Sequence, residues 1–194
     1  MSRLAGIVLA AGTSARFGAD NKLLAEYVGH PMVCSVVEAA LATDLDPVIV
    51  VTGHDAGSVQ AALAGHDVVF VHNAGFEAGQ AGSLKTGIAV VPQSCAGAMI
   101  LLGDMPDVTA EIINQLLDVF VDENSIIVPQ HEGVRGNPVI LGKGSFAEVE
   151  KTSGDKGARS LLSGDNVRMI DVDTEAVLRD FDTPDSLKRR DSGF

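Results

Sequence analysis

The chain has 194 residues, 46% of them hydrophobic, which suits one domain with a sizeable core and argues against disorder. No apolar run reaches the roughly 18 residues that a membrane span needs. A net charge of −12 is a poor match for binding nucleic acid. The N-terminus lacks a signal-peptide pattern, and Cys34 and Cys95 lie in apolar surroundings with no metal-ligand spacing. We therefore expect a cytoplasmic protein with two buried free thiols.

Strands and helices alternate along the chain. Short apolar runs predict the strands, and apolar residues at helical spacing, together with capping residues, predict the helices. The predicted strands cover residues 4–10, 47–52, 67–71, 98–102, 125–129, 137–141 and 167–172. The predicted helices cover 31–41, 55–64 (capped by Asp55), 83–91 (capped by Ser83), 109–120 (capped by Thr109), 145–151, 157–162 and 183–190.

This alternation predicts a three-layer, Rossmann-like α/β fold, with a mostly parallel sheet and helices on both faces. We find no low-complexity linker, so we expect a single domain over 1–194. Its first part, about 1–124, would carry the parallel units, and its second part, about 125–194, would add an antiparallel edge. Ligands bind beyond the carboxyl ends of strands in such sheets, so the loops after residues 10, 71 and 102 are expected to converge.

The loop after the first strand carries the strongest chemical signal. Gly12 and Gly18 let the backbone turn tightly, and Arg16 and Lys22 place two cations beside it. Exposed amides with Arg and Lys make a phosphate-binding site. The glycine spacing matches neither a Walker loop nor the dinucleotide fingerprint, which disfavours a dehydrogenase. From these residues alone, an ordinary strand-to-helix loop with solvated charges stays open.

The whole string from Leu9 to Lys22, Leu-Ala-Ala-Gly-x-Ser-x-Arg-Phe-Gly-x-x-x-Lys, resembles the signature of nucleotidyltransferases with a glycosyltransferase-A-like fold. Among these it is most similar to the molybdenum-cofactor nucleotidyltransferases. The resemblance implies that the loop wraps a triphosphate, with Arg16 on the β- and γ-phosphates and Lys22 on the α-phosphate in the transition state. The nucleotide-binding residues that it implies in this loop are Leu9, Ala10, Ala11, Gly12, Thr13, Ser14, Arg16 and Lys22.

Two further segments resemble the family's nucleotide site. Residues 73–84 are similar to its glycine-rich loop, which implies that Asn73 and Ser83 donate hydrogen bonds to the base or ribose. Helix capping is the alternative role of Ser83. Gly103 opens the segment Gly-Asp-Met-Pro, where it is expected to lie against the nucleotide.

Asp104 follows a predicted strand and would face the triphosphate, a suitable place for a Mg²⁺ ligand. Its ordinary alternative is a turn or capping aspartate. Gly-Asp-Met-Pro resembles the family's metal-binding Gly-Asp-x-Pro, and the stretch 180–187 resembles its closing Asp-x-Asp-Thr-Pro-x-Asp-Leu. The resemblance implies Asp104 and Asp182 as metal ligands, although Thr183 with Pro184 also suits a simple helix start.

The acceptor side is implied by resemblance to the cytidylyl branch of the family. Arg135, Gly136, Asn137 and Pro138 are similar to Arg-Gly-His/Asn-Pro, and the stretch containing Asp155 and Lys156 is similar to Gly-Asp-x-Gly-Ala-Arg. These segments would form a basic face for an anionic pterin, whereas an isolated Arg135 or Lys156 would normally be a surface charge. Related families with an alanine at the position of Ala11 use CTP, whereas those with a glycine there tend to use GTP, so the resemblance implies CTP.

The resemblance therefore implies Mg²⁺-dependent transfer of CMP from CTP to the terminal phosphate of molybdopterin, with release of pyrophosphate. A molybdoenzyme or its maturation factor could be a partner. We keep three alternatives open: a GTP-using molybdopterin guanylyltransferase, a sugar or methylerythritol-phosphate cytidylyltransferase, and a noncatalytic chaperone that binds the molybdenum cofactor.

Overall fold

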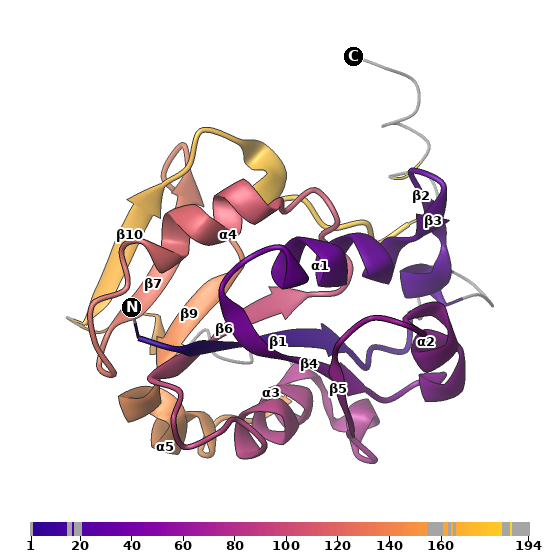
Figure 1. The fold of residues 1–194 in the computed structure, drawn as a ribbon, viewed down its shortest axis with the longest axis horizontal. Coiled ribbons are helices and arrows are strands. Elements are labelled where there is room, and N and C mark those ends of the chain that lie inside the picture. The colour runs from indigo at the N-terminus through magenta and orange to yellow at the C-terminus, as the bar shows by residue number, and fades with distance from the viewer. Residues whose placement is uncertain are drawn as a thin grey trace.

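The computed structural model describes residues 2–14, 17, 21–154, 161–162, 164, 166–183 and 187. Strands and helices alternate through the first two thirds of the chain (Figure 1). The strands are β1 (Leu4–Ala10), β2 (Glu26–Tyr27), β3 (His30–Pro31), β4 (Leu45–Thr52), β5 (Val69–His72), β6 (Gly97–Leu102), β7 (Ile126–His131), β8 (Val134–Arg135), β9 (Val139–Gly142) and β10 (Val167–Asp171). The helices are α1 (Met32–Leu41), α2 (Ala56–Ala62), α3 (Gln80–Ala89), α4 (Ala110–Leu117) and α5 (Phe146–Val149), with 3₁₀-helices η1 (Lys22–Leu24), η2 (Phe76–Ala78), η3 (Lys143–Ser145) and η5 (Glu175–Val177).

The main sheet has the strand order β10-β7-β9-β6-β1-β4-β5, with β8 paired to β7. The pairs β1–β4, β1–β6, β4–β5 and β10–β7 are parallel. The antiparallel strand expected from the second part of the chain is β9. It lies inside the sheet, between β6 and β7, because it pairs antiparallel with both of them. The predicted mostly parallel sheet is confirmed, and its outer strands on this path are β10 and β5.

Helices cover both faces of this sheet and make three layers (Figure 1). Side chains alternate between the two faces of β1, as expected for a strand that is buried on both sides. Leu4 and Val8 belong to the core under α1, α2 and α4, whereas Ala5 and Ile7 belong to the core under α3 and α5. The predicted α/β architecture follows from these two cores.

Several predicted boundaries differ from the structure. Ser83 does not cap a helix, because α3 begins at Gln80 and Ser83 lies one turn inside it. Pro31 ends β3 instead of opening the helix, and α1 begins at Met32. The hairpin of β2 and β3 was not predicted, since strands of two residues leave no periodic signal. The predicted helix 157–162 lies largely, and 183–190 almost wholly, outside the described residues.

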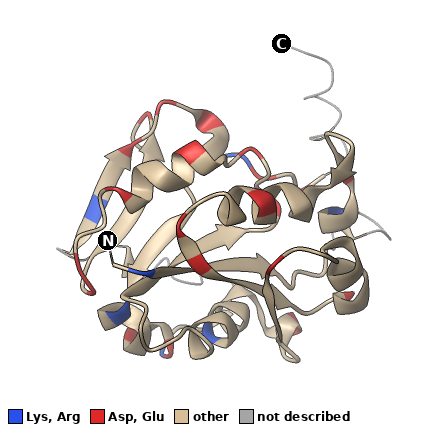
Figure 2. Cartoon of the chain, viewed as in Figure 1, with Lys and Arg blue, Asp and Glu red and all other residues tan. Residues whose placement is uncertain are grey.

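The structure confirms the state that the sequence predicts for the two thiols. Both cysteines are buried and free, and burial raises the pKa of each thiol. Asp and Glu are spread over the ribbon, and Lys and Arg are few (Figure 2). Across the part of the chain that the structure describes, no helix has both the length and the apolar character that crossing a membrane requires.

Candidate active site

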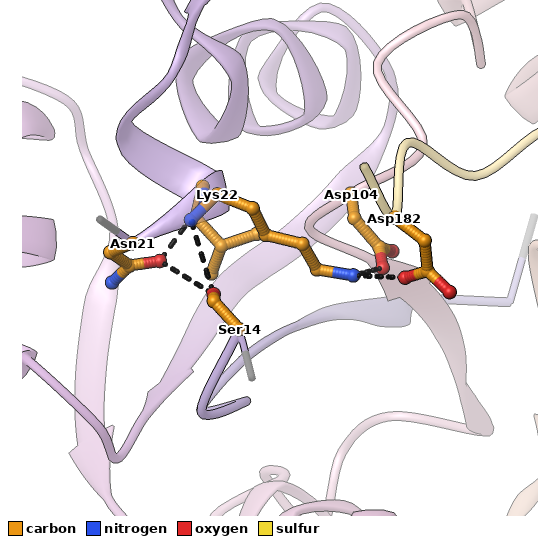
Figure 3. A network of polar contacts seen from close by, with 6 residues as sticks. Ser14, Asn21, Lys22, Asp104 and Asp182 are labelled. Carbon is orange, nitrogen blue, oxygen red and sulfur yellow. Dashed lines mark hydrogen bonds and ion pairs between the residues drawn. The ribbon is translucent and has the colours of Figure 1, made fainter. Parts of the chain in front are cut away.

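Ser14 and Asn21 hydrogen-bond to each other and to the backbone at the start of η1 (Figure 3). The Ser14 hydroxyl accepts a hydrogen bond from the Lys22 amide at 3.1 Å and donates to Asn21 Oδ1 at 3.3 Å. Asn21 caps η1 by accepting from the Leu23 amide at 3.1 Å. These bonds fix the backbone of Lys22, so that its long side chain starts from a defined point.

Lys22 reaches two carboxylates that come from distant parts of the chain (Figure 3). Its Nζ lies 2.5 Å from Asp104 Oδ2 and 2.6 Å from Asp182 Oδ1. The exposed fractions of the three side chains are 14% for Lys22, 18% for Asp104 and 25% for Asp182. Asp104 follows β6, and Asp182 follows η5. The structure thus brings together three residues that the sequence singled out.

The charges of this group act on one another. Burial acts to lower the pKa of Lys22, but the carboxylates of Asp104 and Asp182 outweigh it and raise the pKa above its ordinary value. The ammonium group is therefore charged throughout the physiological range.

Asp180 is a third carboxylate at the site, and sequence reasoning missed it. One carboxylate oxygen from each of Asp104, Asp180 and Asp182 lies within 4.8 Å of the others. Asp180 is exposed as a residue, yet partial burial of its carboxyl, followed by the negative charges of Asp182 and Asp104, raises its pKa. The available signal was the spacing Asp-x-Asp, which puts both side chains on one side of an extended segment.

We expect Asp180→Asn to stabilise the metal-free protein at neutral pH and to weaken Mn²⁺ binding on the order of tenfold. Because the folded-state pKa of Asp180 is raised, its ionisation costs the folded state stability as the pH rises through that pKa. The gain in stability from Asp180→Asn should therefore shrink as the pH falls toward 4.

Urea unfolding at pH 7 and at pH 4 measures this gain in stability. Asp173→Asn, which removes an exposed carboxylate outside the cluster, is the control. A loss of stability at pH 7 in Asp180→Asn would contradict the prediction.

A cavity of about 420 Å³ opens beside Lys22, between the loop after β1 and the start of α3. Its lining includes most of the predicted nucleotide residues of the first loop, together with Ser83 in α3. It is also lined by residues to which the sequence assigned no role, among them Phe76, Glu77 and Gln80. The predicted residues that line it are Leu9, Ala11, Gly12, Thr13, Ser14, Lys22, Ser83 and Asp104.

Three predicted nucleotide residues lie behind the lining instead of in it. Asn73 is buried; its amide donates to Ser83 Oγ at 3.1 Å and its carbonyl accepts from the Gly75 amide at 3.0 Å, so it shapes the loop. The Gly103 amide donates to the Leu9 carbonyl at 3.0 Å, and a Cβ on Gly103 would lie 3.0 Å from the same oxygen. Ala10 is buried in the core. These residues set the shape of the cavity.

Of the predicted acceptor residues, the structure describes the stretch from Arg135 to Pro138 but not Asp155 and Lys156. The Arg135 side chain donates to the Leu162 carbonyl at 2.7 Å. Gly136 and Asn137 run against η5: the Asn137 amide donates to the Val177 carbonyl at 2.8 Å, and a Cβ on Gly136 would lie 2.3 Å from that oxygen. Pro138 lies with Asn137 beside Leu102 at the end of β6. The other predicted residues, Asp155, Lys156 and the loop cation Arg16, lie outside the described residues.

Comparison with known proteins identifies the family. A family model described as "MobA-like NTP transferase domain" matches residues 6–171. The chain belongs to this family. It is 26% identical over 190 residues to the molybdenum cofactor cytidylyltransferase of Escherichia coli (strain K12), across 96% of this chain and 95% of that protein. It is also 28% identical over 196 residues to the nicotine blue oxidoreductase of Paenarthrobacter nicotinovorans, across 95% of this chain and 94% of that protein.

Solved structures agree with this assignment. The structure of Rv0371c from Mycobacterium tuberculosis H37Rv superposes with a TM-score of 0.85 at 30% sequence identity, covering 97% of each chain. A structure of the same protein in complex with manganese superposes with a TM-score of 0.81 at 30% identity, covering 100% of each chain. The present chain is thus a nucleotidyltransferase with the expected α/β fold.

Proposed function

We propose that the protein transfers CMP from CTP to the terminal phosphate of molybdopterin, in a Mg²⁺-dependent reaction that releases pyrophosphate. The observation that carries the proposal is the Lys22 ammonium group, held between Asp104 and Asp182 beside the cavity of the first loop. The name of the Escherichia coli relative, which aligns along nearly its whole length, supports the choice of nucleotide and acceptor.

The residues present suit a divalent cation. Asp104, Asp180 and Asp182 offer only carboxylate oxygens, the ligands that Mg²⁺ and Mn²⁺ accept in proteins. Lys22 Nζ contacts two of these carboxylates, so a positive charge already stands where a metal would bind. The manganese complex of Rv0371c supports a divalent ion in a relative. When bound, the ion would neutralise negative charge on the triphosphate.

The chain's own residues would position the reacting phosphates. Gly12, Thr13 and Ser14 line the cavity, and their backbone amides would cradle the triphosphate. Lys22 would turn from the carboxylates toward the α-phosphate, where charge develops, and Arg16 would hold the β- and γ-phosphates. A terminal phosphate oxygen of molybdopterin would attack the α-phosphorus in line, and the bond to the β-phosphate oxygen would break. Such transfers depend on positioning and charge stabilisation.

In this proposal the choice of CTP over GTP rests on Ala11, through the family resemblance. Ala11 lines the cavity beside Gly53, where an added Cβ would lie 2.8 Å from Ala11 Cβ and 2.6 Å from Phe76 Cβ. This wall of the cavity therefore has no room for a side chain at position 53.

We expect pyrophosphate release only when CTP and molybdopterin are both present. The measurement compares CTP, GTP, ATP and UTP, each with and without molybdopterin, in the presence of Mg²⁺. Release with GTP alone among the nucleotides, or with a sugar phosphate in place of the pterin, would contradict the proposal. Tight binding of the pterin without release from any nucleotide would instead favour a noncatalytic chaperone.

A further inference from the structure

The segment that carries Asp180 and Asp182 has no helix or strand to fix it. It leaves η5 and runs past Asp104, and alternate residues face opposite ways. Asp180 and Asp182 meet Asp104, whereas Arg179 and Phe181 contact the body of the protein. The position of two site carboxylates therefore depends on how these two intervening residues are held.

Phe181 fixes the segment by burial. Its side chain is 1% exposed and packs with Tyr27 and Met32 in a small core of its own. The rings of Phe181 and Tyr27 meet edge to face, with centroids 5.7 Å apart and planes at 64°. The Phe181 amide also donates to the main-chain carbonyl of Asp104 at 3.1 Å. Main chain and ring together tie the segment to the turn after β6.

Asp107 holds the same segment through its charge. Its carboxylate accepts a hydrogen bond from the Tyr27 hydroxyl at one oxygen and from Arg179 at the other, where Arg179 Nη1 lies 3.1 Å away. Only 12% of the Asp107 side chain is exposed, against 41% for Arg179. Asp107 lies three residues after Asp104, on the same turn. Its carboxylate therefore connects this turn to the segment of Asp180 and Asp182 through Arg179, and to the β2–β3 hairpin through Tyr27.

We propose that Tyr27, Asp107 and Arg179 form a positioning cluster that sets the separation between Asp104 and the pair Asp180 and Asp182, and thereby the affinity of the site for a divalent cation. None of the three belongs to the described group of carboxylates that could hold the cation, which is Asp104, Asp180 and Asp182. The inference rests on the proposed metal-dependent function and adds to it the residues that hold its ligands in place.

The chemistry of metal sites gives the expected size of the effect. Three carboxylates repel one another, so the protein has to hold them together before a cation arrives. Residues that orient ligands without touching the metal typically change its affinity by about 10–100-fold when mutated. No helix or strand fixes the segment that carries Asp180 and Asp182. Without an anchor, the repulsion would therefore move these two carboxylates away from Asp104. Asp107 and its two donors supply that anchor.

The test measures Mn²⁺ binding to the nucleotide-free protein, with free Mn²⁺ followed by electron paramagnetic resonance. Tyr27→Phe removes only the hydroxyl and leaves the ring on Phe181, and Asp107→Asn removes the charge at nearly constant shape. We expect each to raise the Kd for Mn²⁺ about tenfold. Arg179→Gln should do the same, and Arg179→Lys should recover part of the loss because it restores the charge.

Arg3→Gln is the matched control. It breaks the pair of Arg3 with Asp46, whose charged atoms lie 2.7 Å apart. Arg3 directly precedes β1 and Asp46 is near the start of β4, so the pair lies at the opposite end of these strands from the site. Its Mn²⁺ affinity should equal that of the wild type. If the cluster variants lower the urea midpoint but bind Mn²⁺ as the wild type does, the three residues serve stability alone and the proposal is overturned.

A second measurement separates this proposal from the proposed function. Wild-type protein that binds no Mn²⁺ would count against metal-dependent transfer, yet the cluster can still be tested without metal. Arg179→Gln is introduced into wild type and into Lys22→Met, and unfolding in urea is compared. If Arg179 holds Asp180 and Asp182 at Lys22, its loss should cost less once Lys22 is gone, because the carboxylates are then free to separate. Strictly additive losses would overturn the positioning role.

Discussion

Asp104→Ala is expected to lower the rate of nucleotidyl transfer about 10³-fold while the protein stays folded. The substitution removes a carboxylate that Lys22 contacts at 2.5 Å beside the cavity. The fold should survive because the bond that ties Phe181 to this turn uses the main-chain carbonyl of Asp104, which alanine retains. Pyrophosphate release at saturating CTP and molybdopterin gives the rate, and circular dichroism checks the fold.

Asp171→Ala is the control for this variant. Asp171 also ends a strand, β10, but its carboxylate accepts from Gln130 at 2.8 Å, and it does not line the cavity. Its activity should match that of the wild type. An Asp104→Ala protein within a few-fold of wild-type turnover would contradict the assigned role. A noncatalytic chaperone would keep delivering its cofactor in spite of this substitution.

Lys22→Met should lower transfer by about 10²–10³-fold and also destabilise the metal-free protein by about 1–3 kcal/mol. Without the ammonium group, the largely buried carboxylates of Asp104 and Asp182 lose their shared cation and repel each other. Mn²⁺ should then restore more stability to Lys22→Met than it adds to the wild type, because the metal no longer competes with Lys22. Urea unfolding with EDTA or with Mn²⁺ measures both effects.

The pH dependence gives an independent check on the same ion pairs. The pKa of Lys22 is raised in the folded protein, so the stability from its charge is complete below about pH 10.5 and declines as the pH rises through the folded-state pKa. This decline should be missing in Lys22→Met, and Lys22→Arg should retain the stability at neutral pH. Equal stabilities of Lys22→Met and wild type in EDTA would contradict the ion pairs.

The central strands were predictable because strands buried on both faces consist largely of apolar residues. β1, β4 and β6 are covered on both faces, so they appear as continuous apolar runs. The place of β9 was not predictable in the same way. Its apolar run shows that it is buried, but only pairing with β6 and β7 puts it inside the sheet.

The first loop and Asp104 could be chosen from the sequence since each directly follows a predicted strand, where α/β sheets bind ligands. Asp180 was not chosen, although the spacing Asp-x-Asp was an available signal, because its place at the site depends on its neighbours Arg179 and Phe181, which turn it toward Asp104. Ser83 was wrongly predicted as a cap because a serine before an apolar turn has the pattern of a helix start. In the structure, the helix had begun at Gln80.

The pair of Lys22 and Asp182 joins residues 160 positions apart. During synthesis the loop after β1 leaves the ribosome long before Asp180 and Asp182 do. The edge of β6 also stays unpaired until residues 139–142 have been made. A chain that stops before residue 180 therefore contains the loop and Asp104, but has neither Asp180 nor Asp182 to meet them. The group of three carboxylates can therefore form only after residue 182 has been made.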